Sequence, residues 1–490
     1  MNLEKAIDYI KGETPNFSPA LLQRDVTSFV IDSREVKAGD VFFALSQPEY
    51  AQNGFNGEFA DSTAFAAEAL KKGAVAAVVR CDRFEEHADQ LESFRDRLIF
   101  VDDVIAGFQR LAHGVYVEWG RPVVAITGSA GKTTAKELTA HVLEASGRRV
   151  LRNIKNYNNG LGHPLTVLRL AGDSTFDIAV LEMGMSTPLN EIARLCRITP
   201  PDVAIELNVL PVHIEHLGTI ENIAKAKAEL VEGMKPGGTA VLNADDDRVA
   251  AMRSLSKGSV VTYGIKNRAD VSASDLVFAG FGETKFTLTT PTGSAEVDFP
   301  LNGTHNVMNA LAASAAGHVF GMNASEIAAS LSSVAAPPQR GEVLRFAAGF
   351  TVINDSYNSN PDALLSMVDT LVDGAPATSR KIVVAGEMLE LGENEIDVHR
   401  ETGIAIASRR IDVLIGVRGL AAELVAGAES AGIVEARFAN DSDAAGELLS
   451  SIVSAGDVVL VKGSRGVRTE MVVERLIEKF DLEDTRPATV

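Results

Sequence analysis

The sequence has few cysteines and no long apolar run. Only Cys81 and Cys196 are present in 490 residues, and they do not form a pair at metal-ligand spacing. This excludes a disulfide framework and argues against a structural zinc site. No stretch reaches the roughly 18 apolar residues of a membrane span, and residues 1–8 lack a basic segment followed by an apolar one. We therefore expect a cytoplasmic protein that does not insert into a membrane.

The sequence also has fewer basic than acidic residues. Lys and Arg number 46 against 66 Asp and Glu, so the formal net charge is −20. This balance disfavours nonspecific binding to nucleic acid or to an anionic membrane surface. A polyanionic ligand must therefore be held by locally placed Lys, Arg and backbone N–H groups. The length predicts about three domains at roughly 150 residues each.

One glycine is missing from a phosphate-binding loop. Residues 123–134 read Val-Val-Ala-Ile-Thr-Gly-Ser-Ala-Gly-Lys-Thr-Thr, and Ile126 stands where the pattern G-x-x-x-x-G-K-[ST] begins with glycine. A strand that enters a glycine turn at a helix N-terminus directs backbone N–H groups and the helix dipole at one point. Lys132 would add a cation, and Thr133 or Thr134 a hydroxyl for Mg²⁺. An ordinary strand-helix connector is the alternative, but the apolar run and Gly-Lys-Thr-Thr together favour phosphate binding.

Two breakers divide the chain into three blocks: 1–118, 119–336 and 337–490. They are Trp119-Gly-Arg-Pro122 and the proline-containing stretch 334–339. The first block predicts helices at 3–10 and 66–73 and a strand at 74–79, with a turn and a hairpin after Asp32. The other two alternate strands with helices, so we expect an α/β protein with parallel sheets, the third being smaller and Rossmann-like. Expected strands are 123–127, 178–182, 203–207, 239–243, 350–354, 381–386, 412–416 and 457–462; expected helices include 133–146, 189–196 and 221–234.

Polar residues follow several of these strands, where ligands of parallel sheets gather. Glu182 ends a buried strand and suits a metal bound to the nucleotide. His305, Asn306 and Asn309 lie one helical turn apart and suit a planar base. Taken alone, His213 and His216 read as loop residues, and Lys225 and Lys227 as solvated surface. The stretches 354–361, 386–392 and 462–466 are further strand ends whose residues, taken singly, fit ordinary loops.

The ordered set of motifs resembles the Mur ligase family of peptidoglycan synthesis over nearly the whole chain. Its members here are Thr127–Thr134, Asn156–Pro164, Glu182–Gly184, the His213 loop followed by Ala226-Lys227, Asn243–Asp246, His305–Asn309 and the linker Arg340. The stretches Asp355–Pro361, Glu387–Gly392 and Lys462–Arg465 are similar to the branch that adds D-alanyl-D-alanine to UDP-N-acetylmuramoyl-tripeptide. Tyr-Asn-Ser-Asn-Pro at 357–361 stands where diamino-acid-adding members carry a Tyr-Ala-His-Thr-Pro type sequence.

The resemblance implies an ATP-driven amide ligase. The tripeptide carboxylate would take the γ-phosphoryl group of ATP, the resulting acyl phosphate would react with the amine of D-alanyl-D-alanine, and ADP and phosphate would leave. ATP and Mg²⁺ are the implied cofactors. The first block would hold the UDP-sugar, the second ATP and the third the dipeptide. We expect a monomer that binds no nucleic acid.

Residue roles follow from the same resemblance. Lys132, Glu182, His213 and Lys227 are implied as catalytic; Thr133, Glu182, His213 and Lys227, the last as a carbamate, are implied as metal ligands. ATP would contact Gly128, Ser129, Ala130, Gly131, Lys132, Thr133, Thr134, Asn306, Asn309 and Arg340. The UDP substrate would contact Ser33, Arg34, Asn158 and Asn159, and the dipeptide Asp355, Asn358, Asn360, Lys462 and Arg465. The segment 55–61 departs from the family's Asp-Gly-His-x-Phe form.

Three alternatives remain. Another amide ligase of this architecture, such as a folylpolyglutamate synthase or a different Mur ligase, is disfavoured by the first block and by Tyr-Asn-Ser-Asn-Pro. A nucleotide switch or motor would carry Asn-Lys-x-Asp or an acidic pair after a strand, whereas Glu182 stands alone before Met183. A non-catalytic scaffold would release no phosphate when substrate is added. The sequence leaves open whether the third residue of the tripeptide is lysine or diaminopimelate, and whether Lys462 or Arg465 holds the dipeptide carboxylate.

Overall fold

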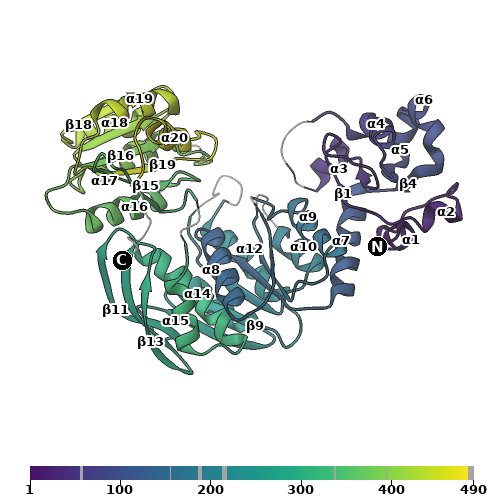
Figure 1. Ribbon diagram of the computed structural model, residues 1–490, viewed down its shortest axis with the longest axis horizontal. Coiled ribbons are helices and arrows are strands. Elements are labelled where there is room, and N and C mark those ends of the chain that lie inside the picture. The colour runs from purple at the N-terminus through teal and green to yellow at the C-terminus, as the bar shows by residue number, and fades with distance from the viewer. Residues whose placement is uncertain are drawn as a thin grey trace, which may run out of the picture.

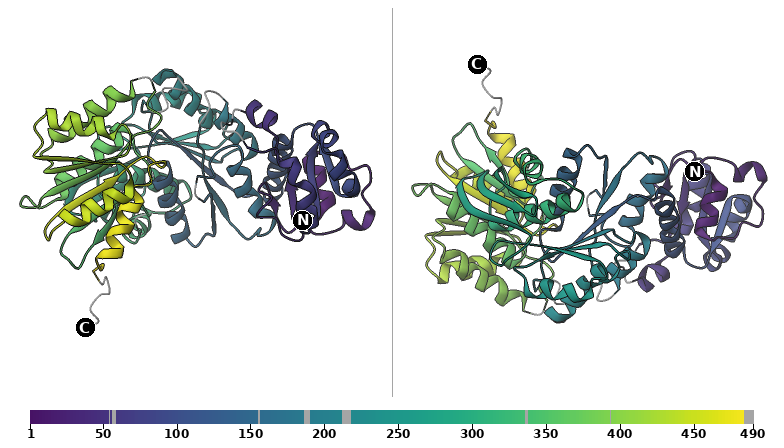
Figure 2. Two further views of the ribbon diagram at one scale, coloured as in Figure 1. Left: turned by 90° about the horizontal axis from the view of Figure 1, so that it is seen from above. Right: turned by 90° about the horizontal axis from the view of Figure 1, so that it is seen from below.

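Three sheets follow one another along the chain. The computed structural model describes residues 1–53, 55, 59–154, 156–185, 190–211, 218–335, 338–392 and 394–483. The sheets have four, nine and six strands, and we call the parts built on them the first, central and third lobes. The central lobe lies between the other two (Figures 1 and 2). Within the described ranges, no helix is long and apolar enough to cross a membrane.

The first lobe is a parallel sheet in the order β1-β2-β3-β4. The hairpin expected after Asp32 is wrong, because β1 and β2 run parallel, with Phe29 opposite Val41. The connection between them buries Val36 and therefore packs over the sheet instead of turning back. The elements are α1 (Leu3–Ile10), α2 (Pro19–Leu22), β1 (Phe29–Val30), β2 (Val41–Phe43), α3 (Gln47–Gln52), α4 (Ala66–Lys71), β3 (Ala76–Arg80), α5 (Cys81–Glu86), α6 (Ala88–Leu91) and β4 (Leu98–Val101).

Helix α7 (Val104–Trp119) joins the first and central lobes. Near its start, Phe108 contacts Phe43 edge to face with ring centroids 4.8 Å apart. Near its end, the Tyr116 hydroxyl donates to Pro200 O at 3.1 Å, and Trp119 Nε1 donates to Phe176 O at 3.0 Å. One apolar cluster continues from the first sheet across α7 into the central sheet. The two lobes therefore share a core, and the predicted boundary at residue 118 lies within this helix.

The central sheet has the order β13-β12-β11-β10-β9-β8-β5-β7-β6. The expected strands are present, and three antiparallel strands, β11 to β13, extend the sheet beyond them. The strands are β5 (Val123–Thr127), β6 (Val150–Arg152), β7 (Ile178–Glu182), β8 (Val203–Glu206), β9 (Thr239–Asn243), β10 (Ser259–Gly264), β11 (Val271–Gly280), β12 (Glu283–Thr290) and β13 (Gly293–Phe299). The helices are α8 (Lys132–Ala145), α9 (Gly162–Val167), α10 (Glu191–Ile198), α12 (Ile220–Glu232), α13 (Asp247–Ala251), α14 (Thr304–Val319) and α15 (Ala324–Ser332).

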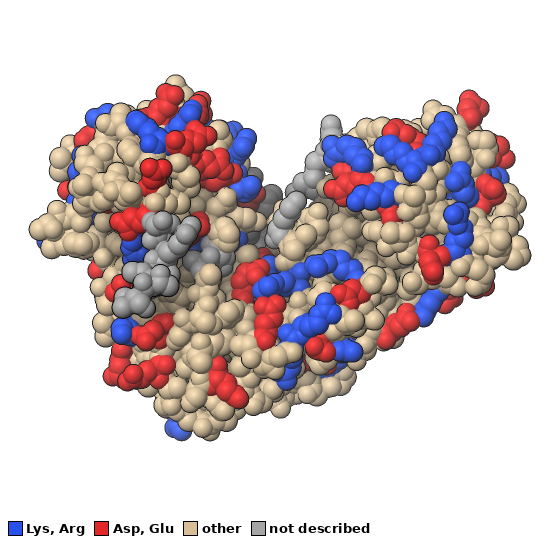
Figure 3. Space-filling model, viewed as in Figure 1, with Lys and Arg blue, Asp and Glu red and all other residues tan. Residues whose placement is uncertain are grey.

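The third lobe confirms the Rossmann-like expectation. Its sheet has the order β14-β15-β19-β16-β17-β18, and every pair is parallel except β14 with β15. The strands are β14 (Glu342–Arg345), β15 (Thr351–Asp355), β16 (Lys381–Gly386), β17 (Val413–Val417), β18 (Glu435–Ala439) and β19 (Val458–Lys462). The helices are α16 (Pro361–Gly374), α17 (Glu395–Ala407), α18 (Ala421–Ser430), α19 (Ser442–Ile452) and α20 (Glu470–Lys479). Figure 3 shows this face of the molecule hollowed between the first and third lobes, with acidic and basic side chains interspersed.

The turn between β11 and β12 anchors the third lobe to the central lobe. Phe281 at this turn is only 8% exposed and packs into a core cluster of the third lobe that includes Leu364. Arg345 Nη2 donates to Phe281 O at 2.9 Å. A Cβ placed on Gly374 would come within 2.8 Å of the Phe281 ring, so this glycine admits the ring. The two lobes are therefore held together at a point distinct from the covalent linker.

We expect Phe281→Ala to destabilise the third lobe by about 3 kcal/mol, because a buried aromatic ring is lost and its cavity remains. Urea unfolding and hydrogen exchange in α16 measure this effect. Val277→Ala is the matched control, since Val277 lies on the same hairpin and is 53% exposed; it should change stability by no more than about 0.5 kcal/mol. Equal effects of the two substitutions would contradict the conclusion that Phe281 anchors the third lobe to the central lobe.

Candidate functional site

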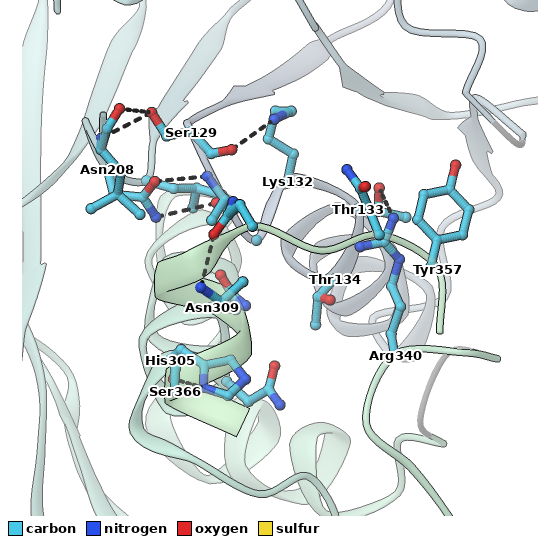
Figure 4. A pocket seen from close by; sticks show the side chains of 18 of the residues that line it. Ser129, Lys132, Thr133, Thr134, Asn208, His305, Asn309, Arg340, Tyr357 and Ser366 are labelled. Atoms are coloured by element: carbon cyan, nitrogen blue, oxygen red, sulfur yellow. Dashed lines mark hydrogen bonds between the residues drawn. The ribbon is translucent and has the colours of Figure 1, made fainter. Parts of the chain in front are cut away.

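A cavity of about 650 Å³ lies where the central lobe, the linker and the third lobe meet (Figure 4). It is lined by the loop after β5, the ends of β7 and β8, the start of α14 and the strand ends of the third lobe. Sixteen of the predicted site residues line it: Ser129, Ala130, Gly131, Lys132, Thr133, Thr134, Asn158, Glu182, Asn306, Asn309, Arg340, Asp355, Asn358, Asn360, Lys462 and Arg465. Segments far apart in the sequence thus form one site.

The glycine loop is held by Asn208, which follows β8. The Ser129 amide donates to Asn208 O at 3.0 Å, and the Ala130 amide donates to Asn208 Oδ1 at 2.9 Å. Asn208 Nδ2 returns a hydrogen bond to Ala130 O at 3.1 Å. Two loop amides are thereby used to fix the loop, and the amides left for an anion are those of the first turn of α8, which lack partners within the helix.

Sequence reasoning did not assign Asn208 a role. Its position directly after a buried strand was the available signal.

Gly131 supplies the tight turn into α8. Its φ of 83° lies in the left-handed region, which favours glycine. A Cβ at this position would also lie 2.5 Å from Asn309 Oδ1. Asn309 itself is 5% exposed, and it packs against the loop from α14. The predicted loop and the predicted Asn309 are therefore in direct contact.

Lys132 begins α8 and folds back over the loop. Its Nζ donates to Gly128 O at 2.8 Å and to Ser129 O at 3.3 Å (Figure 4). Burial lowers the pKa of Lys132, and the nearby Arg340 adds to this, while Glu182 opposes it. An anionic ligand beside the ammonium would favour its charged form. A phosphate in the cavity would thus favour the protonated form of Lys132.

Thr133 joins three segments through its hydroxyl. It donates to Glu182 Oε2 at 2.8 Å and accepts from Arg340 Nη2 at 3.0 Å. The second carboxylate oxygen of Glu182 accepts from Asn158 Nδ2 at 2.8 Å. Glu182 is 4% exposed, so these contacts compensate for the burial of its charge. Asn158, which was assigned to the UDP substrate, lies beside Glu182 and lines this cavity, and its role in substrate binding stays a prediction.

Asn153 holds the backbone of Glu182, and Lys136 in turn holds Asn153; sequence reasoning missed both residues. Asn153 Oδ1 accepts from the Glu182 amide at 3.0 Å, and Asn153 Nδ2 donates to Glu182 O at 2.8 Å. Lys136, which is 1% exposed, donates through Nζ to Asn153 O at 2.7 Å. Nothing in the residues around Lys136, four positions beyond Lys132 on the same helix, indicates this role.

Lys227 lies behind the cavity on α12 and is 2% exposed, so its reading as solvated surface is wrong. Its pKa is lowered to about 7, chiefly by burial and also by the charge of Lys132, while Glu206 opposes the shift. Burial likewise raises the pKa of Glu206 well above its usual value. Neither carboxyl oxygen of Glu206 accepts a hydrogen bond from any residue that the structure describes. Near neutral pH the Lys227 amine is therefore neutral in a substantial fraction of molecules.

The predicted His213 lies outside the described residues, as does His216. Within the described ranges, no group of three His, Cys, Asp or Glu side chains is placed to hold a metal ion. The hydroxyl of Thr133 and the carboxylate of Glu182 place two hard oxygen ligands side by side next to the glycine loop.

The helix α14 brings its N-terminal residues to the cavity wall. Asn306 is 5% exposed and donates through Nδ2 to Asn302 O at 2.8 Å. His305 Nδ1 lies 3.3 Å from Ser366 Oγ of α16, so this pair bridges the central and third lobes. Asn306 and Asn309 both line the cavity from this helix, and their contact with a planar base stays a prediction.

Lys462 and Arg465 differ in how freely their charges can be used. Lys462 is 5% exposed; its ammonium pairs with Asp355 and donates to Asn358 O at 2.8 Å. The Arg465 side chain is 59% exposed and pairs with Glu470 at 3.0 Å. Asn360 caps α16 by accepting from the Ala363 amide at 2.8 Å. Lys462 and Asn360 therefore organise the loop after β15, and Arg465 is the more accessible cation.

Three residues assigned to the UDP substrate lie away from this cavity. Arg34 of the first lobe has an 86% exposed side chain and pairs with Asp32 at 2.6 Å. Ser33 O accepts from Lys72 Nζ at 3.3 Å. Asn159 Oδ1 accepts from the amides of Leu161 and Gly162 at the start of α9. A role for Ser33, Arg34 and Asn159 in substrate binding stays a prediction.

Two family models match the chain. Residues 126–317 match the Mur ligase middle domain, and residues 339–465 match the Mur ligase, glutamate ligase domain. A UDP-N-acetylmuramoyl-tripeptide--D-alanyl-D-alanine ligase of Bacillus subtilis is 33% identical over 475 residues, covering 96% of this chain and 97% of the relative.

Two solved structures of similar proteins cover almost the whole chain. A crystal structure of MurF from Acinetobacter baumannii has a TM-score of 0.84 and 26% identity, and the match covers 97% of this chain and 98% of that one. MurF ligase from Thermotoga maritima in complex with ADP has a TM-score of 0.78 and 28% identity, with 94% and 99% covered. Both support the three-lobed fold.

Asn208→Ala should weaken ATP binding about tenfold, because the loop loses the side-chain hydrogen bonds that fix Ala130, each worth about 1 kcal/mol net. The dissociation constant of a non-hydrolysable ATP analogue measures this. Asn267→Ala is the matched control, since Asn267 is exposed and its side-chain amide donates to Ala244 O, away from the loop. Unchanged affinity in Asn208→Ala would mean that the loop keeps its shape without this residue.

Proposed function

Because the chain belongs to the Mur ligase family, we propose that it joins D-alanyl-D-alanine to UDP-N-acetylmuramoyl-tripeptide with hydrolysis of ATP to ADP and phosphate. The product is the UDP-N-acetylmuramoyl-pentapeptide of peptidoglycan synthesis. One observation carries the proposal: the residues expected for ATP and those expected for the dipeptide line a single cavity across the lobe boundary. ATP and the attacking amine can therefore meet there.

The reaction needs an activated carboxyl group, because an oxide is a poor leaving group. A carboxylate oxygen of the tripeptide attacks the γ-phosphorus of ATP, the bond to the bridging oxygen breaks, and ADP leaves. Lys132 and the amides of the first turn of α8 hold the phosphates. Arg340, which donates to the hydroxyl of Thr133, faces the same point and would stabilise the transferring group.

Mg²⁺ fits the oxygen ligands on this side of the cavity, since Thr133 offers a hydroxyl and Glu182 a carboxylate. His213 is the further ligand that the family resemblance implies. The ion, when bound, reduces the repulsion between the triphosphate and the carboxylate. Asn153 and Asn158 hold Glu182 in place for this role, the first at its backbone and the second at its carboxylate.

The second step joins the amine to the carbonyl carbon of the acyl phosphate, and phosphate leaves as the amine loses a proton. The exposed Arg465 would pair with the carboxylate of the dipeptide, while Lys462, Asp355 and Asn358 keep the loop after β15 in place. Ser33 and Arg34 of the first lobe would contact the UDP moiety. We place the reaction in the cytoplasm and assign it to a monomer.

Lys227 would act as a carbamate. Carbon dioxide reacts with a neutral amine, and the burial that lowers the pKa of Lys227 to about 7 supplies that form. The product is an anion, which suits a site that must hold Mg²⁺.

The proposed function predicts that phosphate release from ATP requires both substrates. Purified protein with Mg²⁺ and UDP-N-acetylmuramoyl-tripeptide should release phosphate when D-alanyl-D-alanine is added, with a pentapeptide product of matching mass. Stimulation by a single amino acid in place of the dipeptide would assign the chain to another ligase of the family. No stimulation by any acceptor would favour a switch or a scaffold.

Lys227→Ala should lose most of the ligation activity, because the site loses the anion that the carbamate provides. Short carboxylic acids added to the assay should restore part of it by supplying a carboxylate in the vacated space. Lys225→Ala is the matched control on the same helix. Near-normal activity of Lys227→Ala, with no response to added acid, would contradict the carbamate.

A further inference from the structure

The aromatic ring of Tyr357 lies close to two cations that belong to different parts of the site. The guanidinium of Arg340, in the linker, lies 4.0 Å from the ring centroid, and that of Arg465, in the third lobe, lies 5.7 Å from it. Figure 4 shows the ring beside Arg340. Tyr357 follows β15 in the same loop as Asp355 and Asn358. Neither composition nor spacing had assigned it a role.

The Arg340 guanidinium has two neighbours that restrict its position. Its face packs on the Tyr357 ring, and its Nη2 donates to the Thr133 hydroxyl at 3.0 Å. An arginine side chain has several rotatable bonds, so it occupies one position only when contacts restrict it. The stack restricts the plane of the guanidinium, and the hydrogen bond restricts its direction.

We propose that Tyr357 is a positioning residue that holds Arg340 against the phosphate-binding loop and links the dipeptide loop to the ATP site. This inference rests on the proposed function, because it takes the cavity to bind ATP on one side and the dipeptide on the other. The ring belongs to the third lobe, the guanidinium to the linker and Thr133 to the central lobe. A movement of the loop after β15 therefore shifts the surface on which Arg340 rests.

The ring, and not the hydroxyl, performs this function. The Tyr357 hydroxyl makes no hydrogen bond to a described residue, whereas the ring face contacts Arg340 at a distance well within the range of a cation–π interaction. Phenylalanine keeps the ring and leucine removes it, so the two substitutions separate the contributions. Neither introduces a charge or a larger side chain.

The first test measures binding of a non-hydrolysable ATP analogue, which needs no acceptor substrate. Tyr357→Leu should weaken binding about tenfold, within the range expected for a partly desolvated cation–π contact, and Tyr357→Phe should bind like the unsubstituted chain. Phe320→Leu is the control, because it removes another arginine stack, with Arg148 at 5.5 Å, far from the cavity. Equal affinities of Tyr357→Leu and the unsubstituted chain would overturn the proposal.

The second test uses Arg340→Lys, which keeps the charge but loses the flat group that stacks. In this background Tyr357→Leu should cause less than a twofold further loss of affinity. A full tenfold loss would overturn the proposal, because the ring would then act without Arg340. In the ligation assay, Tyr357→Leu should lower kcat/KM for ATP about tenfold while KM for the UDP substrate is unchanged.

A general loss of folding would instead change both KM values and the circular dichroism spectrum, and would overturn the positioning role. If the unsubstituted chain forms no pentapeptide, the proposed function fails, and the binding tests still decide the role of Tyr357.

Discussion

The hydroxyl of Thr133 is the contact on which the geometry of the site depends. It donates to Glu182 at the end of β7 and accepts from Arg340 in the linker, so three separate segments meet at one oxygen. Neither partner is free to move independently. Asn153 fixes the backbone of Glu182, and Tyr357 supports Arg340 from the third lobe. A change of lobe position is therefore transmitted to Thr133 in the first turn of α8.

The glycine loop is short, so a residue outside it, Asn208 after β8, is needed to hold its shape. A longer loop can direct more of its own amides at a phosphate, but here the amides of Ser129 and Ala130 donate to Asn208. The first turn of α8 and Lys132 then provide the groups for the anion. Asn208 restricts a loop that contains two glycines and would otherwise lose much conformational entropy on binding. The nucleotide affinity that we propose for this loop would thus depend partly on Asn208, which follows β8.

Local patterns predicted β5, β7, β8 and β9 of the central sheet and four of the six strands of the third sheet, since alternating apolar runs and glycine turns are properties of neighbouring residues. They also placed Glu182 near the loop, because the ends of parallel strands share one edge. Asn306 and Asn309, which lie on a helix, were assigned to ATP by the family resemblance. Contacts between distant segments could not be predicted from local patterns. The burial of Lys227, the anchor at Phe281 and the stack on Tyr357 each depend on packing between elements far apart in the chain. The antiparallel strands β11 to β13 carry little alternation with helices and were missed.

The chain has a negative net charge, yet it must bind anionic ligands. Some of the cations near the cavity are paired with carboxylates, and others stay accessible to a ligand. Lys462 is buried against Asp355, so its charge is largely balanced and serves to fix the loop. Arg465 keeps an exposed side chain, and its pairing with Glu470 is the kind that a ligand carboxylate can displace at little cost. This difference favours Arg465 over Lys462 for the dipeptide, since removing a buried lysine from its partner would leave an uncompensated charge. A ligand that binds to Arg465 also lies next to Tyr357, and hence next to the residue that orients Arg340.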